Sequence, residues 1–522
     1  MTMIDDVALG RVRAGSSLLL GAEALCAFGV AGVLTAAGAR LGIDPETRIA
    51  QVSILASLQF AAAALGIALV AALLVAGRMR AAAPAAVVRR LVWAGSSGIA
   101  SGIVAGGTAA ALHGTPWPLF AARGDGGQVL RWAHEVLAGT GGPPGQYPPG
   151  AVQTLIWTTQ LFGWELAPAQ KFLQIVGVAA IGPLAYLAWR LVLAPSWAAA
   201  VGFSSCVPFL DPYKPIASIS LVLATPLFVA LVLTLHSSPN RSWLRLLVRS
   251  ALLGFGLGLV FLAYSGWIVW CAPGVVMAGL FAFPWSSWRS GLLVAVGSVG
   301  AFCAVSSSYL ISFFTSGGVA DNYRYFDTDT DPAYFAAWFG DLPGAIAQWP
   351  PFGEFGGVGL FTIGLAAGMG FALAIGWHSW VVRTAVLIFA GAWLSRFWIA
   401  AQMSSTGLVQ LYPRTNQVLL HTALICTAFA LCSALQALMR AEGAETKSTR
   451  AHGRTHGGYA IGALTCLFLL ASSIGSATAD RYLPADDGTV AKFAFFAHDP
   501  YGAPEYDLEF CEDYLGLATC PR

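Results

Sequence analysis

The sequence predicts an all-α polytopic membrane protein, and two features of its composition lead to that prediction. Of its 522 residues, 57% are hydrophobic and only 10% are charged, whereas soluble domains carry about 25% charged residues. The chain also contains 18 Trp, 14 Tyr and 30 Phe, as expected where aromatic rings anchor helix ends at lipid headgroups. A set of soluble domains is therefore excluded. Nucleic-acid binding is not expected either, because the chain has no basic cluster large enough to follow a phosphate backbone.

Thirteen apolar runs are candidates for membrane-spanning helices, because a span needs about 20 mostly apolar residues whose backbone amides pair within their own segment. The runs cover residues 15–37, 52–76, 91–112, 169–190, 196–210, 216–236, 250–264, 266–284, 291–314, 356–376, 384–400, 417–439 and 458–477. The fifth and seventh are short for a full crossing. We expect one transmembrane domain over 1–478, with about thirteen spans and no internal repeat, followed by a tail at 479–522.

The distribution of charge predicts how this bundle is oriented, because Lys and Arg accumulate in cytoplasmic loops. With the N-terminus inside the cell, the cytoplasmic side holds 16 of the 28 Lys and Arg residues, and the opposite side holds 21 of the 26 carboxylates. A plasma-membrane protein with a cytoplasmic N-terminus and an extracytoplasmic C-terminus is therefore expected. Cys511 and Cys520 in the tail either form a disulfide in an oxidising compartment or remain free thiols. The other seven cysteines lie in apolar runs and predict no zinc site.

Polar residues concentrate in two external loops, 113–168 and 315–355, and in the tail. Within the first loop, 150–163 is amphipathic and too short to cross, so we expect it to lie on the membrane surface. The preceding Tyr147-Pro148-Pro149-Gly150 fixes the backbone where that helix begins. This asymmetry places the expected working site on the outer face.

Asp125 is the candidate catalytic residue of the first loop. It lies in Arg123-Gly-Asp125-Gly-Gly, where glycine leaves room for a substrate to approach. A carboxylate in this place can act as a general base and take the proton of an attacking hydroxyl. The alternative is a solvated turn, since Asp beside Gly is common turn chemistry.

Positive charge near the membrane surface can stabilise a phosphate group. Five cations lie near the outer ends of predicted spans: Lys171, Lys214, Arg324, Arg396 and Arg414. Among them, Lys214 in Asp211-Pro-Tyr213-Lys-Pro and Arg414 after Pro413 are preferred, because proline limits how far they can move. The alternative for each cation is an interfacial anchor whose charged end reaches the headgroups.

Metal binding has one candidate, the alternating run Asp327, Asp329 and Asp331, which spaces oxygen ligands as a divalent-cation loop does. It lacks the glycine and the terminal Glu of a calcium loop, and the alternative is a solvated face. No cofactor is required, and a divalent cation remains an option. Within the predicted spans, Glu23 is the lone carboxylate, and an ionisable group there has either a functional or a structural role.

The order of several motifs resembles the actinobacterial cell-wall arabinofuranosyltransferases, in particular the type that primes arabinan on galactan. The first match pairs Asp125, Gln128 and Arg131 with Tyr147-Pro148-Pro149-Gly150. The later matches, within about residues 90–440, are Asp211-Pro212-Tyr213, the glycine-rich run Gly254–Gly258 through Tyr264, and Leu411-Tyr-Pro-Arg414-Thr415.

The resemblance implies a GT-C fold, in which a polytopic helical bundle presents a catalytic carboxylate, here Asp125, on its first large external loop. It implies a decaprenyl-phosphate-linked sugar, arabinofuranose, as donor and cell-wall galactan or arabinan as acceptor. The residues expected around the donor are Arg131, Tyr147, Asp211, Tyr213, Lys214, Arg324 and Arg414. The family's soluble C-terminal domain is not expected, because only 479–522 follow the last span.

A second hypothesis is a non-enzymatic translocator or scaffold for polyprenyl-linked sugars. This hypothesis predicts charged side chains deep within the bundle that couple translocation. Glu23 is the one carboxylate within the predicted spans.

Overall fold

A computed structural model describes residues 17–79, 82–316, 360–406, 414–445, 449–485 and 490–500. In these ranges every regular element is a helix, and no strand occurs, so the predicted all-α class is confirmed for this part of the chain. Several predictions lie outside the described residues, namely those for Arg324, for Asp327, Asp329 and Asp331, for most of the loop 315–355, and for Cys511 and Cys520.

Ten of the described helices are long and apolar enough to cross a membrane. They are α2 (Ser17–Ala39), α3 (Arg48–Arg78), α7 (Leu166–Trp189), α9 (Pro215–His236), α10 (Trp243–Ala263), α11 (Ser265–Ala282), α12 (Trp288–Thr315), α14 (Trp380–Ala401), α16 (Thr415–Glu445) and α17 (Thr449–Arg481). By the length and composition of these helices, the chain is a multi-pass membrane protein.

Three other predicted spans also form helices, but these lack the length or the hydropathy of the ten. At a rise of about 1.5 Å per residue, α8 (Pro195–Cys206), with 12 residues, and α13 (Leu360–Gly376), with 17, fall short of a bilayer core of about 30 Å. In contrast, α4 (Ala82–Ala111) has 30 residues but is rich in Gly, Ala and Ser, which lowers its hydropathy. The total of thirteen spans therefore stays a prediction.

The remaining helices are short. They are α5 (Gly124–Ala138), α6 (Gly150–Phe162), α15 (Met403–Thr406), α18 (Ala491–His498) and the 3-10 helices η1 (Val207–Phe209), η2 (Ser238–Asn240) and η3 (Trp285–Ser287). Of these, α6 confirms the helix predicted at 150–163, and it begins directly after Pro149 as the two prolines indicate.

The described residues fall into two compact units. The Asp125 unit comprises those within Ala14–Leu184, Phe209–Ile219 and Tyr459–Arg522, and the Arg414 unit comprises those within Ala185–Pro208 and Ser220–Gly458. In the Arg414 unit, α10 packs on α12, α11 packs on α14, and α16 contacts α8, α13 and α14.

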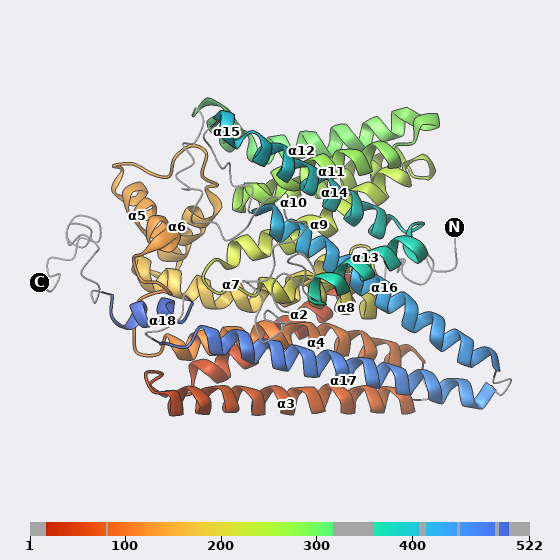
Figure 1. Ribbon diagram of the computed structural model, residues 1–522, viewed down its shortest axis with the longest axis horizontal. Helices are drawn as coiled ribbons and strands as arrows, with labels where there is room; N and C mark the ends of the chain where they lie inside the picture. The colour runs from red at the N-terminus through yellow and green to blue at the C-terminus, as the bar shows by residue number, and fades with distance from the viewer. Residues whose placement is uncertain are drawn as a thin grey trace, which may run out of the picture. The chain divides into compact units, whose positions relative to one another are not determined.

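In the Asp125 unit, helices α2, α3, α4 and α17 lie side by side (Figure 1). Glycines spaced four residues apart on α4, Gly98, Gly102 and Gly106, allow its backbone to approach α2 closely. A Cβ atom on Gly102 would lie 2.9 Å from the Cα of Ala31 and 3.0 Å from the Cβ of Leu34. This is the small-residue packing by which membrane helices associate without a hydrophobic driving force.

Replacing Gly102 by Leu is expected to lower the free energy of unfolding by roughly 1–3 kcal/mol, because the added side chain forces α2 and α4 apart. The matched control is Gly32→Leu on α2, where an added Cβ would meet nothing within 4 Å. Thermal unfolding of both purified variants measures the difference. Equal melting temperatures for the two variants would show that close packing at Gly102 does not matter.

Glu23 is fully buried and forms an ion pair with Arg90, with Nε and Oε1 2.5 Å apart. The pair joins α2 to α4, the same two helices that pack through the glycines. A buried carboxylate is tolerated when a cation compensates its charge. Glu23 therefore has a structural partner, which supports the structural interpretation of this intramembrane carboxylate.

Candidate functional site

Asp125 lies in the first turn of α5 rather than in an irregular turn. The helix begins at Gly124, whose φ of +58° lies in the left-handed region that glycine adopts most easily. The N-cap residue Arg123 has extended backbone angles. A carboxylate in the first turn interacts favourably with the unpaired N–H groups and the positive end of the helix dipole, and Asp125 occupies this position.

The loop before α5 holds two non-glycine residues in left-handed conformations, Phe120 with φ 70° and Ala121 with φ 50°. Such residues cost on the order of 1–3 kcal/mol each and persist only when their surroundings hold them. Here the Phe120 N–H donates a hydrogen bond to the Phe493 carbonyl at 2.7 Å. The Phe120 ring also packs on the rings of Phe493 and Phe496, with centroids 4.5 and 5.7 Å apart.

The segment 490–500, which includes α18, makes further contacts with this loop and with the end of α4. The Thr115 hydroxyl donates to the Ala497 carbonyl at 2.5 Å, and His498 Nε2 lies 2.7 Å from the Ala111 carbonyl. The guanidinium of Arg123 lies 3.8 Å from the centre of the Phe496 ring. Part of the predicted tail is thus built into the site. The aromatic run around Phe493 was the one signal for it in the sequence.

Two glutamines of α7 hold the loop and α5 from another side. Gln174 accepts a hydrogen bond from the Leu119 N–H at 2.8 Å and donates to the Tyr213 carbonyl at 3.3 Å. Gln170 donates to the Gly126 carbonyl at 3.1 Å. Residues four apart share one face of a helix, so α7 presents both amides together. Neither glutamine was predicted from the sequence, although two amides at this spacing in an apolar run were a usable signal.

Asp125 and Lys214 form an ion pair through Oδ2 and Nζ, although 89 positions separate them in the sequence. The Asp125 side chain is 54% exposed and that of Lys214 is 39% exposed. Exposed ion pairs contribute only about 0–1 kcal/mol to stability. The two groups are therefore accessible and can exchange this contact for a ligand. The structure brings together the predicted base and one of the two preferred cations.

Tyr213 connects the turn that carries Lys214 to the start of α5. Its hydroxyl accepts a hydrogen bond from the Gly126 N–H at 3.0 Å, and its own N–H donates to Asp211 Oδ1 at 2.8 Å. The same Asp211 oxygen accepts from the Tyr482 hydroxyl at 2.8 Å. Asp211 and Tyr213, expected near the donor, thus position the Asp125 and Lys214 backbones.

Burial raises the pKa of Tyr213 to about 12, with the charges of Asp125 and Asp211 adding to the effect. Because the folded-state pKa is above the usual value of about 10, the stabilisation is fully present below pH 10. It is lost as the pH rises through the folded value of about 12.

We therefore expect the wild type to lose more stability than Tyr213→Phe between about pH 10 and 12. Chemical denaturation at several alkaline pH values measures this, and ultraviolet difference absorption follows the tyrosinate directly. An identical alkaline pH dependence in both proteins would contradict the buried, neutral state of this phenol.

Arg131 and Tyr147, also expected near the donor, have contacts within the α5–α6 pair. Arg131 hydrogen-bonds to Gln128 and lies 3.6 Å from Glu135 across one helical turn. The Tyr147 ring packs on Trp132 with centroids 4.5 Å apart. These contacts stabilise the pair that carries Asp125.

Arg414 belongs to the other unit and precedes α16. It hydrogen-bonds to the hydroxyl of Tyr264, the residue that ends α10, and its guanidinium lies 5.6 Å from the centre of that ring. Tyr264 in turn stacks on Trp267 with centroids 4.9 Å apart. The expected convergence of Arg414 with Asp125 stays a prediction, because the two residues are in different units. Arg396 is fully buried in α14, where it hydrogen-bonds to Asn416.

Within the described ranges, no group of three or more His, Cys, Asp or Glu residues is arranged to hold a metal ion. The candidate site presents a carboxylate, an ammonium group and the backbone N–H groups at the start of α5.

The sequence matches no model of a known protein family, and no curated protein matches it. The resemblance to arabinofuranosyltransferases stays a prediction.

Proposed function

We propose that this chain is a membrane glycosyltransferase that moves a sugar from a polyprenyl-phosphate donor to a glycan acceptor. One observation carries the proposal. An exposed carboxylate, Asp125, lies at the start of a helix beside an exposed ammonium group, Lys214, in a multi-pass membrane protein. Base and cation are the two groups that transfer from a sugar phosphate requires.

In the proposed reaction, Asp125 accepts the proton of the acceptor hydroxyl while that oxygen attacks the anomeric carbon. The bond between that carbon and the phosphate oxygen breaks, and the polyprenyl phosphate leaves with the bonding electrons. Attack from the face opposite the phosphate inverts the configuration of the sugar.

Lys214 is proposed to leave Asp125 for the donor phosphate. The ion pair is exposed, so the monoanionic phosphodiester of the donor competes for the ammonium group at little cost. The exchange frees the carboxylate to act as base and supplies positive charge where negative charge develops on the leaving group.

The proposed fold family, donor sugar and acceptor rest on the resemblance of the motifs. It supports a GT-C bundle in the plasma membrane, arabinofuranose on decaprenyl phosphate as the donor, and galactan or arabinan as the acceptor. The charge distribution supports a cytoplasmic N-terminus with the site and the C-terminus outside.

The test is to incubate the purified protein with a panel of synthetic polyprenyl-phosphate sugars and oligosaccharide acceptors. Mass spectrometry is expected to detect an acceptor extended by one pentose with the arabinofuranose donor. Binding of a donor without any extended product would instead support the translocator or scaffold. Absence of both binding and product for every donor would refute the proposal.

A further inference from the structure

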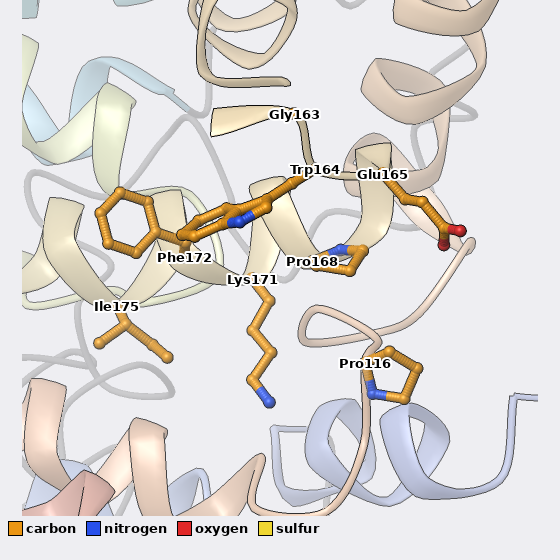
Figure 2. A pocket seen from close by; sticks show the side chains of 8 residues that line it. All are labelled: Pro116, Gly163, Trp164, Glu165, Pro168, Lys171, Phe172 and Ile175. Atoms are coloured by element: carbon orange, nitrogen blue, oxygen red, sulfur yellow. The ribbon is translucent and has the colours of Figure 1, made fainter. Parts of the chain in front are cut away.

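A groove of about 580 Å³ lies along the first turns of α7 in the Asp125 unit. Its walls are mostly apolar, formed by Pro116, Trp164, Pro168, Phe172 and Ile175, and its two charged lining residues are Lys171 and Glu165. Figure 2 shows the Lys171 side chain extending away from the Trp164 and Phe172 rings, with the Glu165 carboxylate pointing in a different direction from its ammonium group.

The ammonium group of Lys171 is held in place but retains donor capacity. It donates to the carbonyls of Leu112 at 2.7 Å and Thr115 at 2.6 Å, and an ammonium group has three N–H donors. In the part of the chain that the structure describes, Lys171 takes part in no ion pair. One N–H donor of the ammonium group therefore remains for a ligand.

The surroundings of the groove are those of a membrane interface. The rings of Phe162 and Trp164 stack with centroids 4.7 Å apart, and Phe172 packs edge-on against Trp164 at 5.3 Å. Nearby on α6, Trp157 is 61% and Leu161 77% exposed. A cluster of exposed aromatic and aliphatic side chains beside a cation is typical of the headgroup region of a bilayer.

We propose that this groove binds an anionic membrane phospholipid, whose phosphate contacts Lys171 and whose acyl chains follow the Trp164 and Phe172 rings. Charge complementarity selects the occupant, since the Lys171 ammonium group, for which no ion pair with Glu165 is found in the described residues, matches a lipid with a net negative headgroup.

The lipid site is distinct from the proposed sugar-transfer site and does not rest on it. Gln170 and Gln174 face Asp125 and its loop, whereas Lys171 and Ile175, each one position further along α7, line the groove. Successive residues on a helix with 3.6 residues per turn are about 100° apart, so the two sites use different faces of α7.

The test is a titration of the purified full chain with phosphatidylglycerol in detergent, followed by native mass spectrometry. Lys171→Met is expected to weaken binding by about tenfold or more, as when a hydrogen bond to a charged group is lost, whereas Lys171→Arg retains binding. The control Lys492→Met removes an exposed lysine of α18 and is expected to bind as the wild type does.

Because Lys171 also contacts the chain after α4, Trp164→Ala provides a second variant that leaves those carbonyl contacts in place. It is expected to weaken phosphatidylglycerol binding while the melting temperature stays unchanged. Wild-type affinity for phosphatidylglycerol in Lys171→Met would overturn the proposal. So would binding of zwitterionic phosphatidylcholine that is equally tight and equally dependent on Lys171. The third contrary outcome is that polyprenyl phosphate binds in a Lys171-dependent way and phosphatidylglycerol does not bind.

Discussion

Asp125→Asn is expected to lower the rate of sugar transfer by about a thousandfold, within the range that general-base catalysis contributes. The amide has the size and shape of the carboxylate and can still lie in the first turn of α5, but it cannot accept the proton of the acceptor hydroxyl. Single-turnover transfer from a lipid-phosphate sugar by the purified variant measures the effect.

The matched control for this substitution is Asp44→Asn, which makes the same chemical change at an exposed residue in the connection between α2 and α3. It should transfer at the wild-type rate. If Asp125→Asn also retains the wild-type rate while it remains folded and membrane-inserted, another group is the base and the proposed mechanism is wrong.

Lys214→Met is expected to lower transfer by about a hundredfold or more, as when one preorganised donor to a developing negative charge is removed. Because negative charge grows on the leaving phosphate in the transition state, the substitution is expected to lower kcat more than it raises the KM for the donor. Lys214→Arg keeps the positive charge and should recover part of the rate. Steady-state kinetics over a range of donor concentrations separates these parameters.

Lys492→Met again provides a control, since it removes a lysine without touching the ion pair. Unchanged kinetics in Lys214→Met would show that the ammonium group only compensates the charge of Asp125. A rise in the KM for the donor at constant kcat would instead mean that Lys214 contributes uniform binding.

The sequence was informative about local structure and about which residue types carry chemistry. Two consecutive prolines and a glycine predicted where α6 begins, because proline fixes its own φ and restricts its neighbour. Asp125 and Lys214 were each identified by their local context. That they form an ion pair could not be predicted, because it depends on how the turn before α9 is placed beside the start of α5.

Most of the residues that hold the Asp125 loop in place were not predicted, for the same reason. Gln170 and Gln174 lie in an apolar run, and only the folded chain shows that their amides pair with the Asp125 loop. The left-handed residues Phe120 and Ala121 have no sequence signature, since non-glycine residues adopt this conformation only when tertiary contacts hold them. The small residues of α4 allow close packing against α2, and they also lower the mean hydropathy of this helix.

The hydrogen bond from the Thr115 hydroxyl to the Ala497 carbonyl joins positions 382 residues apart, so it forms only late in biosynthesis. A ribosome delivers the chain in order, so the Asp125 loop reaches the membrane long before the residues that brace it have been made. The nascent protein must carry this loop without its final support until residue 490 and those after it have been made. Termination ahead of residue 490 would leave the Asp125 loop without its contacts to Phe493 and Ala497.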